Sequence, residues 1–217
     1  MKEKKITGFD YLWIALYACA VFAFELLLSV IENKMGVNFS AATTEQIICH
    51  WVVTTVVWSV LGFLVLWIGK KTTNFNIFEK TEPLGRKQYM LVLLCFIVII
   101  TASYFDWGGY KPYMEFMNLG ALKFIFQYIY YIAEGFLISI VIVYGQKACE
   151  TWFHNDKIPF GGIILGLVWG LAHIFTKGSI WVGLLAAFGA FIMGSSYVFV
   201  NKDYRKALPI IILLFIL

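Results

Sequence analysis

The stretch that decides the fold covers residues 128–143 and reads YIYYIAEGFLISIVIV. It belongs to a longer apolar run, residues 121–144, which is long enough for a helix to cross a lipid bilayer. Glu134 stands in this run, and a second apolar run, residues 160–175, contains His173. An ionisable side chain inside hydrocarbon costs about 3 kcal/mol on insertion scales, so such residues are rare unless they pair, face water or carry out chemistry. Glu134 and His173 are therefore the first candidates for a functional site.

The composition extends the membrane prediction to the whole chain. Of 217 residues, 61% are hydrophobic and only 14% are charged, whereas a soluble domain is about half apolar and a quarter charged. This composition is typical of a polytopic helical membrane protein with short loops. The net charge of +4 is spread over the loops and forms no basic stripe, which argues against nucleic acid as a partner.

The apolar runs predict an all-α transmembrane bundle of six to seven spans, folded as a single domain over residues 1–217. The six predicted spans cover about residues 11–31, 47–68, 89–104, 121–144, 160–175 and 180–200. A last apolar segment, residues 207–217, has about half the length of a span. It predicts either a short, partly inserted helix or the remnant of a longer one. The first run is too long for the apolar region of a signal peptide, so we expect it to be retained as a helix.

The distribution of basic residues predicts the orientation. With the N-terminus in the cytoplasm, thirteen lysines and arginines fall on the inside and four on the outside. Basic residues concentrate on the cytoplasmic side of membrane proteins, so we expect a multi-pass protein of the cell membrane with a cytoplasmic N-terminus. The inside residues are Lys2, Lys4, Lys5, Lys70, Lys71, Lys80, Arg86, Lys87, Lys147, Lys157, Lys202, Arg205 and Lys206, and the outside residues are Lys34, Lys111, Lys123 and Lys177.

Small residues in the fifth span predict close helix packing. Gly162, Gly166 and Gly170 recur at four-residue spacing, a pattern that lets the backbones of neighbouring helices approach each other. Packing is the usual role of such glycines, and we favour it over a role in lining a polar pocket. The four cysteines form no disulfide framework, and Cys149 is expected in a basic loop.

The two ionisable residues are expected at similar depths on consecutive antiparallel helices. Glu134 lies roughly 15 Å, and His173 roughly 20 Å, from the cytoplasmic ends of their spans at 1.5 Å per residue. A direct contact between them is therefore feasible. Glu25 in the first span lies at a similar depth and is a third candidate, whereas His50 is expected at the outer interface and is discounted.

A purely structural interpretation competes with the functional one. Each of the two residues could make only an interhelical hydrogen bond. In this interpretation, a protonated Glu134 carboxyl would bond to Tyr130 or Tyr131. A carboxyl and an imidazole at matched depth favour a site over two independent polar contacts. The chain has no zinc-binding His-Glu-x-x-His motif and no glycine-rich phosphate loop, so we expect no metal and no cofactor.

The sequence around these residues resembles the CPBP family, the CAAX-protease and bacteriocin-processing membrane peptidases also called Abi. That family is marked by Glu-Glu-x-x-x-Arg on one helix, an aromatic-x-x-x-His on the next, and a later His-x-x-x-Asn or Asp. The first motif corresponds here to EGFLIS, which begins at Glu134, and the second to WGLAH, which runs from Trp169 to His173. The order, the spacing and residues 197–209 are also similar, so the resemblance covers about residues 122–217.

The chain departs from the family at several motif positions. Gly135 stands in place of the second glutamate, and Ser139 in place of the arginine. The histidine of the third motif would fall near Leu213 or Leu214, and neither position carries a polar side chain. The loss of one preorganised donor in an oxyanion hole typically slows catalysis about a hundred- to a thousandfold.

The resemblance implies a glutamate-type intramembrane endopeptidase that acts on a membrane-associated peptide or protein. By analogy, Glu134 would activate the attacking water and His173 would position it, as the two catalytic residues. Two alternatives stay open. One is a non-catalytic descendant that acts in bacteriocin immunity or maturation, or that binds a membrane partner. The other is a proton-coupled carrier with Glu25, Glu134 and His173 as a relay, which the lack of an inverted repeat weakens.

Overall fold

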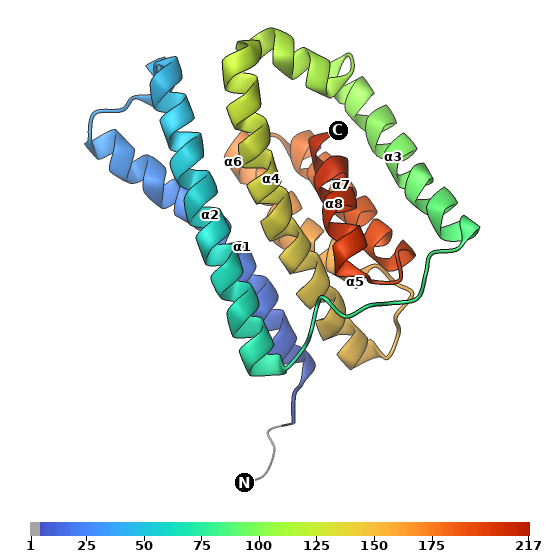
Figure 1. Cartoon of the computed structure of the whole chain (residues 1–217). Coiled ribbons are helices and arrows are strands. Elements are labelled where there is room, and N and C mark those ends of the chain that lie inside the picture. Colours follow the sequence, from blue (N-terminus) through green and yellow to red (C-terminus); the bar gives the residue numbers. More distant parts are fainter. Residues whose placement is uncertain (1–4) are drawn as a thin grey trace.

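The computed structural model describes residues 5–217, and in that range the chain forms only helices and the loops between them (Figure 1). Six segments are long and apolar enough to cross a membrane, so the protein is an all-α, multi-pass membrane bundle, as predicted. Lys2 and Lys4 of the charge count lie outside the described residues. The elements are α1 (Gly8–Lys34), η1 (Phe39–Ala41), α2 (Thr44–Thr73), α3 (Arg86–Trp107), α4 (Lys111–Phe153), α5 (Phe160–Leu165), the π-helical turn η2 (Gly166–Gly170), α6 (His173–Lys177), α7 (Ile180–Phe199) and α8 (Tyr204–Ile216).

The long helices alternate in direction, so the loops gather at two ends of the bundle (Figure 1). The end at which α1 begins also carries the loops 74–85 and 154–159, and we call it the N-terminal end. The other end, which we call the distal end, carries the α1–α2 loop and the α3–α4 turn.

Five of the six predicted spans agree with the observed helices to within five residues at every boundary. Most of the helices are longer than the apolar runs because they continue into polar residues until a cap ends them. In α2, the Thr43 side chain accepts a hydrogen bond from the backbone N–H of Gln46 at the start, and Asn74 adopts the left-handed conformation at the end.

The fourth span differs most from its prediction. α4 extends over 43 residues and bends at Gly120, whose φ of 73° is a conformation that glycine adopts without strain. The bend separates a short leg, residues 111–119, from the long helix of residues 121–153, and the leg crosses the distal end of the bundle (Figure 1). The prediction that Cys149 lies in a loop was wrong, because α4 continues to Phe153 and buries this thiol.

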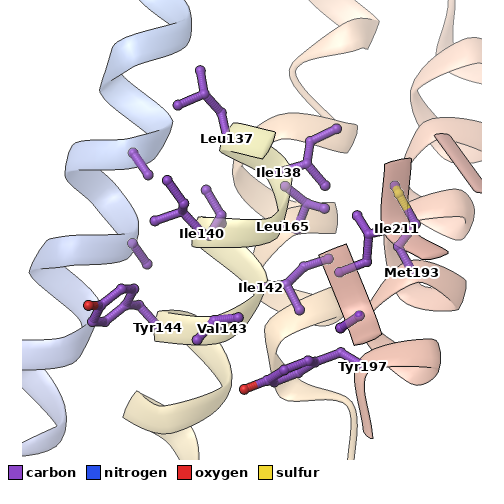
Figure 2. Packing of buried hydrophobic residues seen from close by; sticks show 14 of the residues in the cluster. Leu137, Ile138, Ile140, Ile142, Val143, Tyr144, Leu165, Met193, Tyr197 and Ile211 are labelled. Atoms are coloured by element: carbon purple, nitrogen blue, oxygen red, sulfur yellow. The ribbon is translucent and has the colours of Figure 1, made fainter. Parts of the chain in front are cut away.

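The long helix of α4 is the centre of the bundle and contacts α1, α2, α5 and α8. Its segment 137–144 is buried on every side, which explains why this stretch is apolar all round rather than on one face. Figure 2 shows Leu137, Ile138, Ile140 and Ile142 of this segment among Leu165, Met193 and Ile211 from three other helices.

The fifth span is not a continuous α-helix. α5 ends at Leu165, η2 forms a π-helical turn, and the short α6 begins at His173. Its glycines pack against α7: a side chain on Gly162 would meet the carbonyl oxygen of Ala190, and one on Gly170 would meet the Cα atom of Ala187. The packing interpretation of these glycines is therefore confirmed.

Two helical glycines give a matched test of this packing. In Gly162→Ala, the new methyl group would lie 2.7 Å from the Ala190 oxygen, and we expect a destabilisation of about 1–3 kcal/mol from overpacking. In Gly189→Ala, the nearest atom lies 4.0 Å away, and we expect no loss or a gain of up to about 1 kcal/mol in helix propensity. Unfolding of both variants in a denaturing-detergent titration measures the difference; equal stabilities would contradict the close approach of α5 and α7.

The turn between α7 and α8 is organised by Asp203, whose side chain accepts a hydrogen bond from the backbone N–H of Arg205 and caps α8. Arg205 and Lys206 also form ion pairs with this carboxylate, at 3.0 and 3.1 Å. Burial by itself raises the pKa of Asp203, but the hydrogen bonds and charges of Arg205 and Lys206 outweigh it and lower the pKa from 3.8 to about 2.

This depressed pKa predicts a loss of stability in acid. The stabilisation is fully present above pH 4, where the unfolded carboxyl is also ionised, and it disappears as the pH falls through about 2. Asp203→Asn keeps the cap but removes the charge, and we expect it to cost about 1 kcal/mol at neutral pH, since the two basic partners are partly exposed. The difference in free energy of unfolding between the wild type and Asp203→Asn should shrink towards zero between pH 4 and pH 2. A difference that stays constant over this range would show that the charge of Asp203 is not the source of the stabilisation.

Candidate functional site

Glu134 lies on the long helix of α4, with its side chain partly buried between the helices of the bundle. The Trp169 side chain of η2 acts on it as a hydrogen-bond partner. Three charged groups act on its carboxyl electrostatically: Glu25 of α1, Lys111 of the α4 leg and Lys177 of α6. The groups that act on this carboxyl therefore come from four separate segments of the chain.

His173 begins α6 and is fixed by the residue one helical turn before it. Its Nδ1 lies 2.9 Å from the backbone oxygen of Trp169, and the two rings pack edge to face with centroids 4.5 Å apart. A carbonyl oxygen only accepts hydrogen bonds, so Nδ1 carries a proton. In the neutral ring, Nε2 is then an acceptor that can bind a water molecule.

The structure links the two predicted residues through Trp169 rather than directly. Among the described residues, no hydrogen bond or ion pair joins Glu134 to His173. The indole of Trp169 contacts both, as hydrogen-bond partner of the carboxyl and as ring neighbour of the imidazole. Phe215 of α8 also packs against the indole, with ring centroids 5.8 Å apart.

The α4 leg brings a second polar cluster to the site, which the sequence did not reveal. Glu115 is buried and accepts hydrogen bonds from Gln127, Tyr128 and Tyr131 of the long helix. This cluster holds the leg against the helix. It positions Lys111, whose amine donates a hydrogen bond of 3.1 Å to the backbone oxygen of Phe215 and acts electrostatically on Glu134.

A third polar cluster lies between α1, α2 and α4. Glu25, the third candidate of the sequence, accepts a hydrogen bond of 2.9 Å from the Tyr130 hydroxyl and lies 3.4 Å from Nε2 of His50. Nδ1 of His50 lies 2.7 Å from Glu32. His50, which nothing in the sequence singled out, is buried between two carboxyl groups near the start of α2.

The positions at which the chain departs from the CPBP motifs serve packing. A Cβ atom on Gly135 would lie 2.9 Å from the Ile212 side chain. Because glycine has no side chain, α8 can approach α4 beside Glu134. The Ser139 hydroxyl donates to the backbone oxygen of Phe136 and contacts the Tyr204 hydroxyl. Leu214 is buried in the core. In residues 5–217, no group of three or more His, Cys, Asp or Glu side chains is arranged to hold a metal ion.

Comparison with protein-family models, curated proteins and solved structures gives no match. The arrangement of the side chains is therefore the basis for a functional assignment, together with the resemblance of two short motifs. It contains a carboxyl, Glu134, on which an indole and two lysine charges act, and an imidazole, His173, whose Nε2 can accept a hydrogen bond.

Proposed function

We propose that this protein is a glutamate-type intramembrane endopeptidase, related to the CPBP peptidases, that cleaves a membrane-associated peptide or protein. The observation that carries the proposal is a carboxyl, Glu134, within a membrane-spanning helix, on which the Trp169 side chain and the charges of Lys111 and Glu25 act. Ionisable groups kept at such a depth are functional by default, because their insertion is costly.

In the proposed reaction, the Glu134 carboxylate removes a proton from a water molecule that Nε2 of His173 helps to orient. The water oxygen bonds to the carbonyl carbon of the scissile peptide, and the electron pair of the carbonyl moves to its oxygen. The ammonium group of Lys111 stabilises that negative charge, in place of the arginine and histidine donors of the family. The proton then passes from Glu134 to the amide nitrogen as the carbon–nitrogen bond breaks.

The proposal is tested with the purified protein in liposomes, incubated with a set of single-span peptides and analysed by mass spectrometry for new termini. Cleavage by the wild type and not by Glu134→Gln supports it. Failure of the wild type to cleave any peptide that it binds supports the second candidate, a non-catalytic relative that holds a membrane partner. That candidate is favoured by Gly135, Ser139 and Leu214, which fill motif positions with packing contacts.

We also propose that the N-terminal end of the bundle faces the cytoplasm of a cell-membrane protein, on the basis of the thirteen-to-four charge distribution. A cysteine placed at Thr81, in the loop between α2 and α3, should then stay unlabelled by an impermeant thiol reagent in intact cells. A cysteine placed at Ser40, which is exposed in the α1–α2 loop at the distal end, should be labelled and serves as the control. Labelling of position 81 in intact cells would overturn this orientation.

A further inference from the structure

A polar cavity lies at the N-terminal end of the bundle, roughly 20 Å along α4 from Glu134 at 1.5 Å per residue. Its volume is about 330 Å³, and small-molecule sites have volumes of about 300–1,000 Å³. The loop after α2, the last turns of α4, the end of α7 and the turn before α8 together form its walls. Its lining includes the polar residues Lys80, Gln146, Lys147, Glu150, Tyr197 and Lys202.

Gln146 holds one wall of the cavity in place. Its side chain is buried, and its amide nitrogen donates hydrogen bonds to Glu150 at 2.9 Å and to the backbone oxygen of Ile158 at 3.0 Å. Its amide oxygen accepts a hydrogen bond from the backbone N–H of Gly161, also at 3.0 Å. These contacts fasten the end of α4 to the loop before α5, so this wall is formed by the protein alone.

The turn before α8 forms another part of the wall in an uncommon backbone conformation. Asn201 and Lys202 both have a φ of 58°, in the left-handed region that side chains other than glycine rarely adopt. In this turn the Lys202 amine lies 3.0 Å from Glu150 and 3.4 Å from Asp156. The charge of Lys202 is therefore balanced by the protein. Strained backbone of this kind is found where the surrounding structure determines it, often at binding sites.

Two hydrogen-bond donors that line the cavity have no acceptor. Lys147 is partly buried, its amine lies 5.4 Å from the centre of the Phe75 ring, and it forms no ion pair or hydrogen bond within residues 5–217. Tyr197 is only 3% exposed, and its hydroxyl bonds to no other group in the same part of the chain. In Figure 2 its ring extends from α7 towards Val143 of α4, which also lines the cavity.

An unpartnered donor in a protein interior is costly, because such groups are almost always hydrogen-bonded. Lys147 and Tyr197 therefore require an acceptor inside the cavity, and the positive charge of Lys147 favours an anion. The other unpaired charges of the lining, Glu79 and Lys80, are exposed and of opposite sign. Lys147 lies in the last two turns of α4. This is the end of a membrane-spanning helix, where lipid headgroups carry their phosphates.

We propose that this cavity binds a phosphate group, carried by an anionic lipid headgroup or free in the aqueous phase. The Lys147 ammonium group is its charge partner, as lysine binds phosphate in many proteins. The Tyr197 hydroxyl donates a second hydrogen bond to a phosphate oxygen. Basic pockets between membrane-spanning helices bind anionic headgroups in the same way.

The site is tested with purified, delipidated protein by native mass spectrometry, in a titration with phosphatidylglycerol and with diacylglycerol of the same chains. We expect the wild type to bind one phosphatidylglycerol in preference to diacylglycerol. Lys147→Gln should weaken this binding about tenfold, and Tyr197→Phe, which keeps the packed ring, about three- to tenfold. Lys71→Gln is the matched control, because its amine also lies over an aromatic ring, 4.9 Å from that of Trp67, but outside the cavity. It should bind as the wild type does.

The source of the phosphate is distinguished by calorimetric titration with inorganic phosphate. Binding of inorganic phosphate that Lys147→Gln loses and Lys71→Gln keeps, without a preference for phosphatidylglycerol, assigns the cavity to a soluble phosphate. Binding of neither ligand by the wild type would overturn the site, and so would an equal loss in Lys147→Gln and Lys71→Gln. The cavity would then hold only water. No cleavage is measured, so this proposal and the proposed peptidase activity can fail separately.

Discussion

Glu134→Gln is expected to reduce peptide cleavage about a hundred- to ten-thousandfold, the range that a positioned general base contributes. Glutamine has the size of glutamate and can still interact with the Trp169 indole, but it cannot take a proton from water. The variant should therefore fold and bind substrate as the wild type does. The effect should appear in kcat, with KM nearly unchanged, because the lost interaction is made in the transition state.

Glu45→Gln is the matched control for this variant. Glu45 lies in the first turn of α2 and is exposed, so the same chemical change there should leave cleavage unaffected. His173→Ala should also reduce kcat, because it removes the acceptor that orients water. Equal rates for the wild type and Glu134→Gln would reduce Glu134 to an interhelical polar contact worth about 1 kcal/mol.

Glu115→Ala is expected to cause the largest loss of stability, about 2–4 kcal/mol. The substitution removes an acceptor that is 2% exposed and leaves Gln127, Tyr128 and Tyr131 without it. The leg 111–119 is then no longer held against the long helix of α4. Lys111 should leave its position at the Phe215 oxygen, so the variant should also lose cleavage activity.

Denaturing-detergent titration measures the loss of stability, and hydrogen-exchange mass spectrometry locates it. We expect faster exchange in residues 111–119 and little change in the core segment 137–144, which is buried on every side. Glu79→Ala, in the exposed loop between α2 and α3, is the control and should stay within about 0.5 kcal/mol of the wild type. Unchanged exchange in the leg of Glu115→Ala would contradict the role of Glu115 as its anchor.

The number and positions of the spans could be predicted because a bilayer imposes a length and a composition on each helix. The bend at Gly120 could not, because a glycine within an apolar run is equally compatible with a straight helix. The π-helical turn could not be predicted either. The spacing of Gly162, Gly166 and Gly170 fits an α-helix and does not indicate where the backbone hydrogen bonds change to the π-helical pattern.

The polar groups inside the bundle could be predicted in part. The cost of burying charge identified Glu134, Glu25 and His173 from the sequence alone. The partners were missed because they come from other elements: Trp169 had been considered only as part of a motif, and Lys111 was assigned to a loop. His50 was judged by its depth in one helix, whereas its environment is determined by Glu25 and Glu32 of the neighbouring helix. Only the tertiary structure gives that pairing.

The central claim is that Glu134 activates water for peptide hydrolysis inside the membrane. The most direct test is mass spectrometry of a membrane peptide incubated with the protein in water enriched in the heavy oxygen isotope. We predict that the wild type releases a product with one heavy oxygen in its new carboxyl terminus, and that Glu134→Gln releases no such product. Cleavage at the same rate by both proteins, or binding of the peptide without cleavage by the wild type, would contradict the claim.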